Sequence, residues 1–295
     1  MAYLLLALTT LFWAGNFVLA RAFSVDIPPF SLAFIRWSLA LLILLPFAIP
    51  VMVKNRQLIG DNLKILIVLG ILSVATFNTL AYIGLQYTTA VNGTLMQSSM
   101  PIMILLISAL FLREPASLKQ WLGVAVSLLG VTTLITRGQP DQIVQFQINP
   151  GDLWILLAML VWATYSICLR WRPQGLSGFA FFSVTLSVGV IALIPFAVWE
   201  MAHSDPINWN QDLYLTLGYL ALFPSILAYM FWNYGVARLG AGRAGLFIHL
   251  VPLWGMMLSV LFLGEQVHTF HLWGIGLIFI GIYLAVLSGK RQQAG

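Results

Sequence analysis

The sequence predicts an all-α integral membrane protein of ten transmembrane helices, arranged as two inverted five-helix repeats. Three observations lead to this prediction. The 295 residues are 60% hydrophobic and only 8% charged, whereas soluble domains carry about 25% charged residues. Ten apolar stretches are each long enough to cross a bilayer, which takes about 20 helical residues. The two halves of the chain also repeat each other, and five spans per half force the second half to enter the membrane from the opposite side.

The predicted spans are joined by short connections that carry turn and helix-capping residues, such as 26–29 and 149–152. The first apolar stretch has no charged leader and no small-residue cleavage site, so we expect a retained span and not a signal peptide. The predicted boundaries are 3–21, 30–53, 64–86, 90–112, 118–136, 152–170, 177–199, 213–236, 242–263 and 269–288.

A longer polar stretch at the midpoint of the chain separates the two halves. We therefore expect a first repeat at 1–137, a linker at 138–151, a second repeat at 152–289 and a cytoplasmic tail at 290–295. The basic residues indicate the orientation. With the N-terminus inside, eleven of the fourteen lysines and arginines fall in cytoplasmic segments, which is a strong positive-inside bias. Both termini are expected on the cytoplasmic side.

The internal repeat is clearest in the last two spans of each half, where positions 101–130 align with 252–281 without a gap. Shared leucines mean little in so apolar a chain, but proline, glutamate and glycine each have a distinct backbone or charge role. The matched residues of this kind are Pro101 and Pro252, Glu114 and Glu265, Gly123 and Gly274, and Gly130 and Gly281. Gly84 and Gly235 also correspond, and close helix packing is the favoured explanation. In the first spans, Leu11, Trp13, Ala14 and Arg21 return as Leu160, Trp162, Ala163 and Arg170.

Several functional classes are excluded by what the sequence lacks. It has no Walker loop and no His-Glu-x-x-His motif. Its single cysteine, Cys168, excludes a disulfide framework and a multi-cysteine metal site. The net charge of +5 comes from basic residues scattered among short loops, which does not suggest nucleic-acid binding. We expect neither enzymatic activity nor a cofactor or metal.

Polar and aromatic side chains at membrane depth are the candidates for substrate binding, because polar groups there are costly unless they have a partner or face water. Alternatives remain for several of them. Ser98 and Ser99 can bond their own backbone, lone aromatic rings can be packing, and His249 can be a neutral buried histidine. The candidates are Trp13, Asn16, Phe17, Asn78, Tyr82, Gln97, Ser98, Ser99, Trp162, Tyr165, Tyr229, Trp232, Asn233 and His249.

A second group of residues is expected to have structural or gating roles: Arg36, Pro101, Glu114, Pro252 and Glu265. Each proline frees a backbone carbonyl one turn earlier, which produces either a kink or a binding site. Arg36 lies about 9 Å into the second span at 1.5 Å per residue. Snorkelling to the outer interface and a structural role are together the favoured interpretation. The alternative is that Arg36 attracts an anionic group. All nine acidic residues lie at span ends or in loops, so the pocket should suit a neutral or zwitterionic solute, and the aromatic residues favour an aromatic one.

The chain resembles the drug/metabolite transporter superfamily, in its ten-span, duplicated EamA-type branch. The resemblance covers nearly the whole chain and rests on 12–16, on 34–37 and on the two patterns that run from Pro101 to Glu114 and from Pro252 to Glu265. As a whole the chain is similar to bacterial aromatic-amino-acid exporters of that branch. The resemblance implies a bacterial inner membrane, a central cavity lined by both halves, and alternating access. The second half departs from the first at 179–185, which has no arginine matching Arg36.

The leading hypothesis is a secondary transporter, driven without ATP, that exports amino acids or related small metabolites, aromatic ones being favoured. An exchanger of phosphorylated or other anionic metabolites is the alternative within the class, and it should have several basic residues in the cavity. A membrane sensor or scaffold is the alternative from another class, but it would not need buried polar residues repeated in both halves. The expected partners are the small-molecule substrate and the lipid bilayer, and a monomer is compatible with the sequence.

Overall fold

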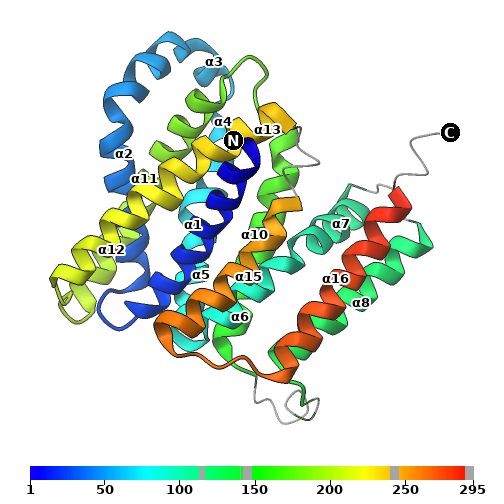
Figure 1. Cartoon of the computed structure of the whole chain (residues 1–295). Coiled ribbons are helices and arrows are strands. Elements are labelled where there is room, and N and C mark those ends of the chain that lie inside the picture. Colours follow the sequence, from blue (N-terminus) through cyan, green and yellow to red (C-terminus); the bar gives the residue numbers. More distant parts are fainter. Residues whose placement is uncertain (113–116, 140, 142–147, 240–245, 290–295) are drawn as a thin grey trace.

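The structure, a computed structural model, describes residues 1–112, 117–139, 141, 148–239 and 246–289. Among these residues all regular secondary structure is helical, and the helices run up and down through one bundle (Figure 1). Eight helical segments are long and apolar enough to cross a membrane, and two shorter apolar helices complete the predicted ten. The beginning of α1 and the end of α16 lie at the same end of the bundle (Figure 1), as an even number of crossings requires.

The helix bounds agree with the predicted spans to within a few residues. In the first half the spans are α1 (Ala2–Ala22), α2 (Pro29–Lys54), α4–η1–α5 (Leu63–Gly70, Ile71–Thr76, Phe77–Tyr87), α6–η2–α7 (Ala90–Met96, Gln97–Ser99, Met100–Phe111) and α8 (Leu118–Ile135). In the second half they are α10–η3 (Pro150–Cys168, Leu169–Trp171), α11 (Gly178–His203), α12–η4–α13 (Gln211–Leu222, Phe223–Leu227, Ala228–Leu239), η5–α15–η6 (Leu246–His249, Leu250–Leu258, Ser259–Leu263) and α16 (Thr269–Gly289). A short helix, α3 (Arg56–Asp61), lies in the connection after α2.

The helices begin at residues that satisfy the free N–H groups of a first turn. Ser117 forms a capping box with Gln120 at the start of α8. The side chains of Thr89, Ser177 and Asn210 accept hydrogen bonds from the first turns of α6, α11 and α12. The chain therefore enters each of these spans at a defined residue, which fixes how far the side chains further along lie from the membrane edge.

The same irregularities occur in corresponding spans of the two halves. A π-helical turn interrupts the third span of each half, at η1 and at η4. A 3-10 turn lies in the fourth span of each half, at η2 and η5, just before Pro101 and Pro252. The two prolines thus lie in the first turns of α7 and α15, where a missing N–H costs little. At each proline the helix type changes from 3-10 to α, at the start of a new helical segment.

The two halves pack against each other through glycines. A Cβ on Gly84 of α5 would lie 2.8 Å from the backbone oxygen of Gly151 and 2.8 Å from Cγ1 of Ile155, both in α10. In the other half, a Cβ on the corresponding Gly235 of α13 would lie 2.5 Å from Leu6 in α1. Both glycines therefore allow close helix packing, as the sequence predicted.

The helices α8 and α16 lie side by side at one edge of the bundle (Figure 1). Their contact again uses the repeated glycines: a Cβ on Gly130 would lie 2.6 Å from the oxygen of Gly274, and one on Gly281 would lie 2.5 Å from the oxygen of Gly123. These two helices form a pair that leaves the central part of the bundle to the first four spans of each half.

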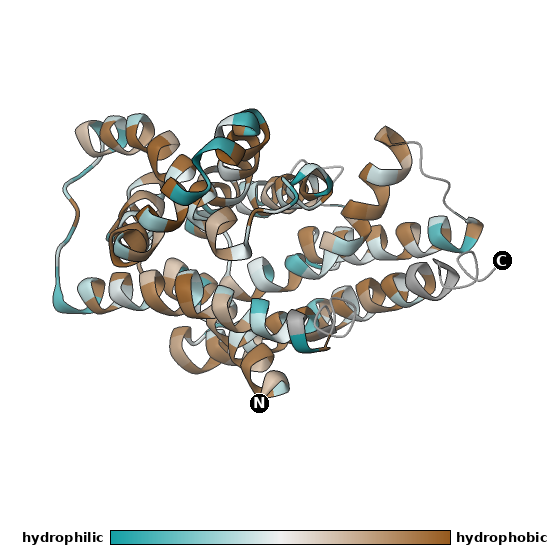
Figure 2. Ribbon diagram, turned by 90° about the horizontal axis from the view of Figure 1, so that it is seen from above, coloured by the Kyte–Doolittle hydropathy of each residue, from teal (hydrophilic) through white to brown (hydrophobic). Residues whose placement is uncertain are grey.

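The outer surface of the bundle is apolar. Most of the ribbon in Figure 2 is brown or pale, and its hydrophilic stretches are short. Large side chains such as Phe47, Phe111, Phe262 and Trp273 are more than 60% exposed. Water would not tolerate so much apolar surface, so the surrounding medium is the hydrocarbon of a bilayer.

Candidate substrate-binding cavity

A cavity of about 260 Å³ lies in the centre of the bundle, and helices of both halves line it. Its polar and aromatic lining comes from α1, α2, α5 and η2 of the first half and from α10 and α13 of the second. The cavity brings together nine of the residues that the sequence predicted for substrate binding: Trp13, Asn16, Phe17, Asn78, Gln97, Trp162, Tyr165, Tyr229 and Trp232.

Aromatic rings form two groups in the cavity wall. Trp13 of α1 lies 5.4 Å from Trp232 and 6.4 Å from Tyr229, both in α13, between ring centroids. Trp162 of α10 lies 4.7 Å from Phe77 and 5.0 Å from Tyr165. Each group therefore contains a contact between the tryptophan of a first span and a third span of the other half, and Tyr165 adds a ring from the same helix as Trp162. The separations are those of favourable aromatic pairs, and the two tryptophans are the pair that the repeat predicted to correspond.

Arg36 of α2 lies inside the bundle and does not snorkel to the outer interface, so that part of the sequence interpretation is wrong. Its side chain is only 3% exposed and lines the central cavity. The guanidinium carbon lies 4.3 Å from the centroid of the Trp37 ring, a cation–π geometry. Four hydrogen-bond acceptors from other helices hold the guanidinium in this inward position, and this network offsets the cost of burying the charge.

The acceptors around Arg36 are all neutral. Its Nε atom donates to Ser225 Oγ at 2.9 Å. Its Nη1 atom donates to Oδ1 of Asn16 at 2.8 Å, to Oδ1 of Asn78 at 3.1 Å and to the hydroxyl of Tyr82. Hydrogen bonds to a charged group are stronger than neutral ones, so the network fixes the arginine firmly. It leaves the positive charge without an acidic partner in the described residues.

The π-helical turns position two of these acceptors. In a π-turn the backbone hydrogen bonds join residues five apart, where those of an α-helix join residues four apart. Two side chains near these turns form hydrogen bonds with the same spacing of five residues. Asn78 Nδ2 donates to the backbone oxygen of Ser73, and Ser225 Oγ donates to that of Leu220. Both contacts span five residues, and they hold Asn78 Oδ1 and Ser225 Oγ where each accepts a hydrogen bond from Arg36.

The other predicted substrate-binding residues lie away from the cavity lining. Tyr82 contacts Arg36 but does not line the cavity, and its hydroxyl also donates to Asn16 Oδ1. Ser99 bonds the backbone oxygen of Met96, the favoured alternative for this residue, whereas the Ser98 hydroxyl has no partner in the described residues. The ring of His249 packs edge-on against Phe279 at 5.5 Å. Asn233 is exposed and lines a separate pocket between α11 and α13.

Of the two repeated glutamates, the structure describes only Glu265, since Glu114 lies outside the described residues. The Glu265 carboxylate accepts hydrogen bonds from the backbone N–H groups of Ala90 and Val91, both at 2.9 Å. It therefore caps the N-terminus of α6 in the other half of the protein, where the helix dipole favours a negative charge. This contact gives Glu265 a structural role between the repeats.

Two further carboxylates join the repeats at the same end of the bundle, and the sequence analysis missed both. Glu200 of α11 accepts hydrogen bonds from the first turn of α2. Asp152 of α10 is fully buried and accepts from Thr88 Oγ1 at 2.5 Å and from Asn92 Nδ2 at 3.1 Å. Asp152, Glu200 and Glu265 all belong to the second half and all bind the first half; we refer to them as the cross-repeat carboxylates. The acidic residues at span ends were the available signal, but their partners are remote in sequence.

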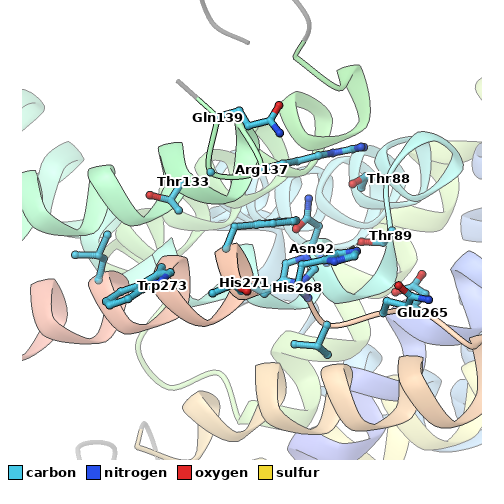
Figure 3. Close-up of a pocket in the computed structure, with 16 residues that line it drawn as sticks. Thr88, Thr89, Asn92, Thr133, Arg137, Gln139, Glu265, His268, His271 and Trp273 are labelled. Atoms are coloured by element: carbon cyan, nitrogen blue, oxygen red, sulfur yellow. Dashed lines mark hydrogen bonds between the residues drawn. The ribbon is translucent and has the colours of Figure 1, made fainter. Parts of the chain in front are cut away.

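A larger pocket of about 1030 Å³ opens at the end of the bundle that holds these carboxylates. Figure 3 shows Arg137, Thr88, Thr89 and Asn92 around it, with Glu265 and His268 on the connection before α16 and His271 and Trp273 on α16 itself. His271 Nδ1 accepts a hydrogen bond from the backbone N–H of His268 at 2.9 Å, so it caps its own helix. The described residues contain no group of three histidine, cysteine or acidic side chains that could hold a metal ion.

The fold and the cavity define a class of protein. A bundle of two repeats that encloses a central cavity, with interrupted helices in matching positions beside it, is an arrangement found in many membrane transporters. Comparisons with known proteins identify the family. The EamA-like transporter family matches residues 1–136 and 149–287, so the chain belongs to this family, within the drug/metabolite transporter superfamily.

Individual relatives agree with this assignment. "Uncharacterized transporter YyaM" of Bacillus subtilis is 28% identical over 283 residues, covering 96% of this chain and 92% of the relative. An "Uncharacterized transporter" of Archaeoglobus fulgidus is 27% identical over 299 residues, covering 99% and 98%. A crystal structure with 19% identity, a TM-score of 0.60 and 99% coverage of this chain shares the fold. The protein is thus a multi-pass membrane transporter, and the names of these two relatives give no substrate.

Proposed function

We propose that this chain is a secondary transporter that exports amino acids or related small metabolites with an aromatic ring, by alternating access through the central cavity. The observation that carries the proposal is the cavity wall itself. Eight of the residues that line it are aromatic, and rings of this kind bind a planar solute by stacking and edge contacts. The polar groups at one side of the cavity would fix the orientation of the solute.

The arrangement of polar contacts supports alternating access. The cross-repeat carboxylates tie the halves together at one end of the bundle, whereas Ser166 and Leu169, near the other end of α10, belong to the cavity lining. We infer that the structure corresponds to a state closed at the carboxylate end. With the N-terminus inside, as the basic residues predict, that closed end faces outward and both termini face the cytoplasm of a bacterial cell.

Counterflow in proteoliposomes tests this function. Vesicles preloaded with an unlabelled candidate solute are diluted into labelled phenylalanine, and a transported solute accelerates uptake of the label. We expect acceleration by aromatic amino acids and related aromatic metabolites, weaker acceleration by small aliphatic amino acids, and none by sugars or phosphate esters. Empty vesicles control for leakage. Absence of any aromatic-dependent uptake by folded protein would overturn the proposal.

A further inference from the structure

Residues in the wall of the central cavity carry hydrogen-bond donors without acceptors. Nε1 of Trp37 and Nε2 of Gln97 are buried atoms with no hydrogen-bond partner, and both residues line the cavity. Arg36 lines it too, and no described residue accepts a hydrogen bond from its Nη2 atom. The described residues also include buried acceptors without a partner, but none of them belongs to a cavity-lining residue. A buried donor without an acceptor is costly, so the cavity is suited to a solute that brings acceptors.

The charge of the lining points to the same kind of solute. Among the described residues that line the cavity, Arg36 is the only charged one. The amide, phenol and hydroxyl groups around it stabilise its charge but do not neutralise it. A guanidinium at membrane depth is expensive without a counter-charge, and its fork of N–H groups matches a carboxylate. The missing negative charge can therefore come from the bound solute.

We propose that the cavity binds an aromatic monocarboxylate, with its carboxylate on Arg36 and its ring between the tryptophans. This inference rests on the proposed function, because it takes the cavity to carry aromatic solutes. Gln97 and Trp37 would donate to the carboxylate oxygens that Arg36 leaves free. The ring would contact Trp13 and Trp162, which belong to the two aromatic groups of the wall.

The same chemistry ranks the other solutes. The α-ammonium of an amino acid would add a second positive charge near Arg36, and the described lining offers it no carboxylate. A phosphate ester carries about two negative charges, whereas a single arginine supplies one positive charge. An aromatic acid without an ammonium group should therefore bind more tightly than the corresponding amino acid or phosphate ester.

The test compares 3-phenylpropionate with 3-phenylpropanamide, which has the same shape and no charge. Binding to purified wild-type protein is measured by equilibrium dialysis, and transport by counterflow. We expect the acid to bind about tenfold or more tightly than the amide, the difference made by a charge-assisted hydrogen-bonded pair, and more tightly than phenylalanine. Equal binding of acid and amide would overturn the proposal. Tighter binding of phenylalanine than of the acid would overturn the ranking by charge.

Substitutions of Arg36 test whether this residue causes the preference for the acid over the amide. Arg36→Gln should abolish the difference between acid and amide, whereas Arg36→Lys should keep part of it because the charge remains. A purely structural role for Arg36 would lower both affinities by the same factor and leave their ratio unchanged, which would contradict the proposal.

A second variant guards against loss of folding in Arg36→Gln. Asn16→Asp places a carboxylate beside Nη1 of Arg36 and should abolish the acid preference by supplying the negative charge from within the protein. Asn210→Asp is the matched control, because Asn210 caps α12 outside the cavity and aspartate caps a helix equally well. The acid preference should survive in this control. Its survival in Asn16→Asp would overturn the proposal.

The outcomes also separate this inference from the proposed function. If wild-type protein binds none of 3-phenylpropionate, 3-phenylpropanamide, phenylalaninol and phenylalanine, the proposed aromatic transport fails. If it binds them without preference for the carboxylate, the aromatic function stands and only the inference about Arg36 fails.

Discussion

The carboxylate of Glu200, near the end of α11, accepts hydrogen bonds from both the backbone N–H of Ser31 at 2.7 Å and its hydroxyl at 2.8 Å. One acidic side chain of the second repeat thus satisfies the first turn of a helix in the first repeat. Glu200 is only 6% exposed, so water cannot readily replace these contacts. The pair joins α2 of the first repeat to α11 of the second, and the same carboxylate also accepts from the backbone N–H of Phe30 at 3.2 Å.

Replacing Glu200 with alanine should therefore destabilise the folded protein. The change leaves the Ser31 N–H and hydroxyl buried without an acceptor, which costs about 1–3 kcal/mol. We expect a lower thermal unfolding midpoint in detergent for Glu200→Ala. Asp205→Ala is the control, since Asp205 is exposed in the connection after the same helix. Equal midpoints for the two variants would show that the contact with Ser31 contributes no stability.

The two tryptophans of the cavity should determine selectivity for aromatic solutes. Trp162→Ala removes one ring of the wall, and an aromatic pair is worth about 0.5–1.5 kcal/mol beyond its buried area, or about two- to tenfold in affinity. Counterflow of phenylalanine should fall by this factor relative to threonine at matched protein levels. Trp209→Ala, in an exposed connection, should leave the ratio unchanged. A proportional loss for both solutes in Trp162→Ala would mean that the ring only packs.

Alanine substitutions at glycines should rank by the atoms that the new methyl group meets. At Gly84 it meets a backbone oxygen of α10, which cannot move without shifting the helix. At Gly235 it meets the side chain of Leu6, which can change rotamer. At Gly218 nothing lies within 4 Å. Overpacking costs about 1–3 kcal/mol, so the order of thermal midpoints should be Gly218→Ala highest, Gly235→Ala lower and Gly84→Ala lowest. A different order would contradict the packing described here.

Cysteine labelling tests the orientation that the basic residues predict. In a Cys168→Ser background, a cysteine at Asp205 should react with an impermeant maleimide added to intact cells. A cysteine at Arg56 should react only after the membrane is opened. Both positions are exposed, so burial does not limit either reaction. External labelling at Arg56 would reverse the orientation and place the cross-repeat carboxylates inside the cell.

The sequence predicted the helices and the repeat because both depend on local patterns. Long apolar stretches and the matched residues Pro101 and Pro252 are visible without a structure. The position of Arg36 was not predictable in the same way, because α2 is apolar on nearly all sides. Its sequence therefore has no polar face that would show which side of the helix points into the bundle. Glu200 and Ser31 are 169 residues apart, and nothing in either segment identifies the other.

The π-turns set a second limit on prediction. An α-helix turns by about 100° per residue, so a turn that holds one extra residue rotates everything beyond it relative to everything before it. The shared face of Asn78 and Tyr82 lies within α5 and was predicted correctly. The direction in which this face points, relative to the earlier part of the same span, depends on the π-turn η1. No residue in the sequence predicts that turn.

The glycine contacts between the two halves of the chain are symmetric. Gly84 meets α10 while its counterpart Gly235 meets α1, and Gly130 meets Gly274 while Gly281 meets Gly123. Exchanging the halves reproduces each contact, so the interface is isologous, as in a two-fold symmetric dimer. A half-length chain inserted into the membrane in both directions would make the same contacts between its two copies. Fusion into one chain lets a single half carry Arg36 while the symmetric scaffold remains intact.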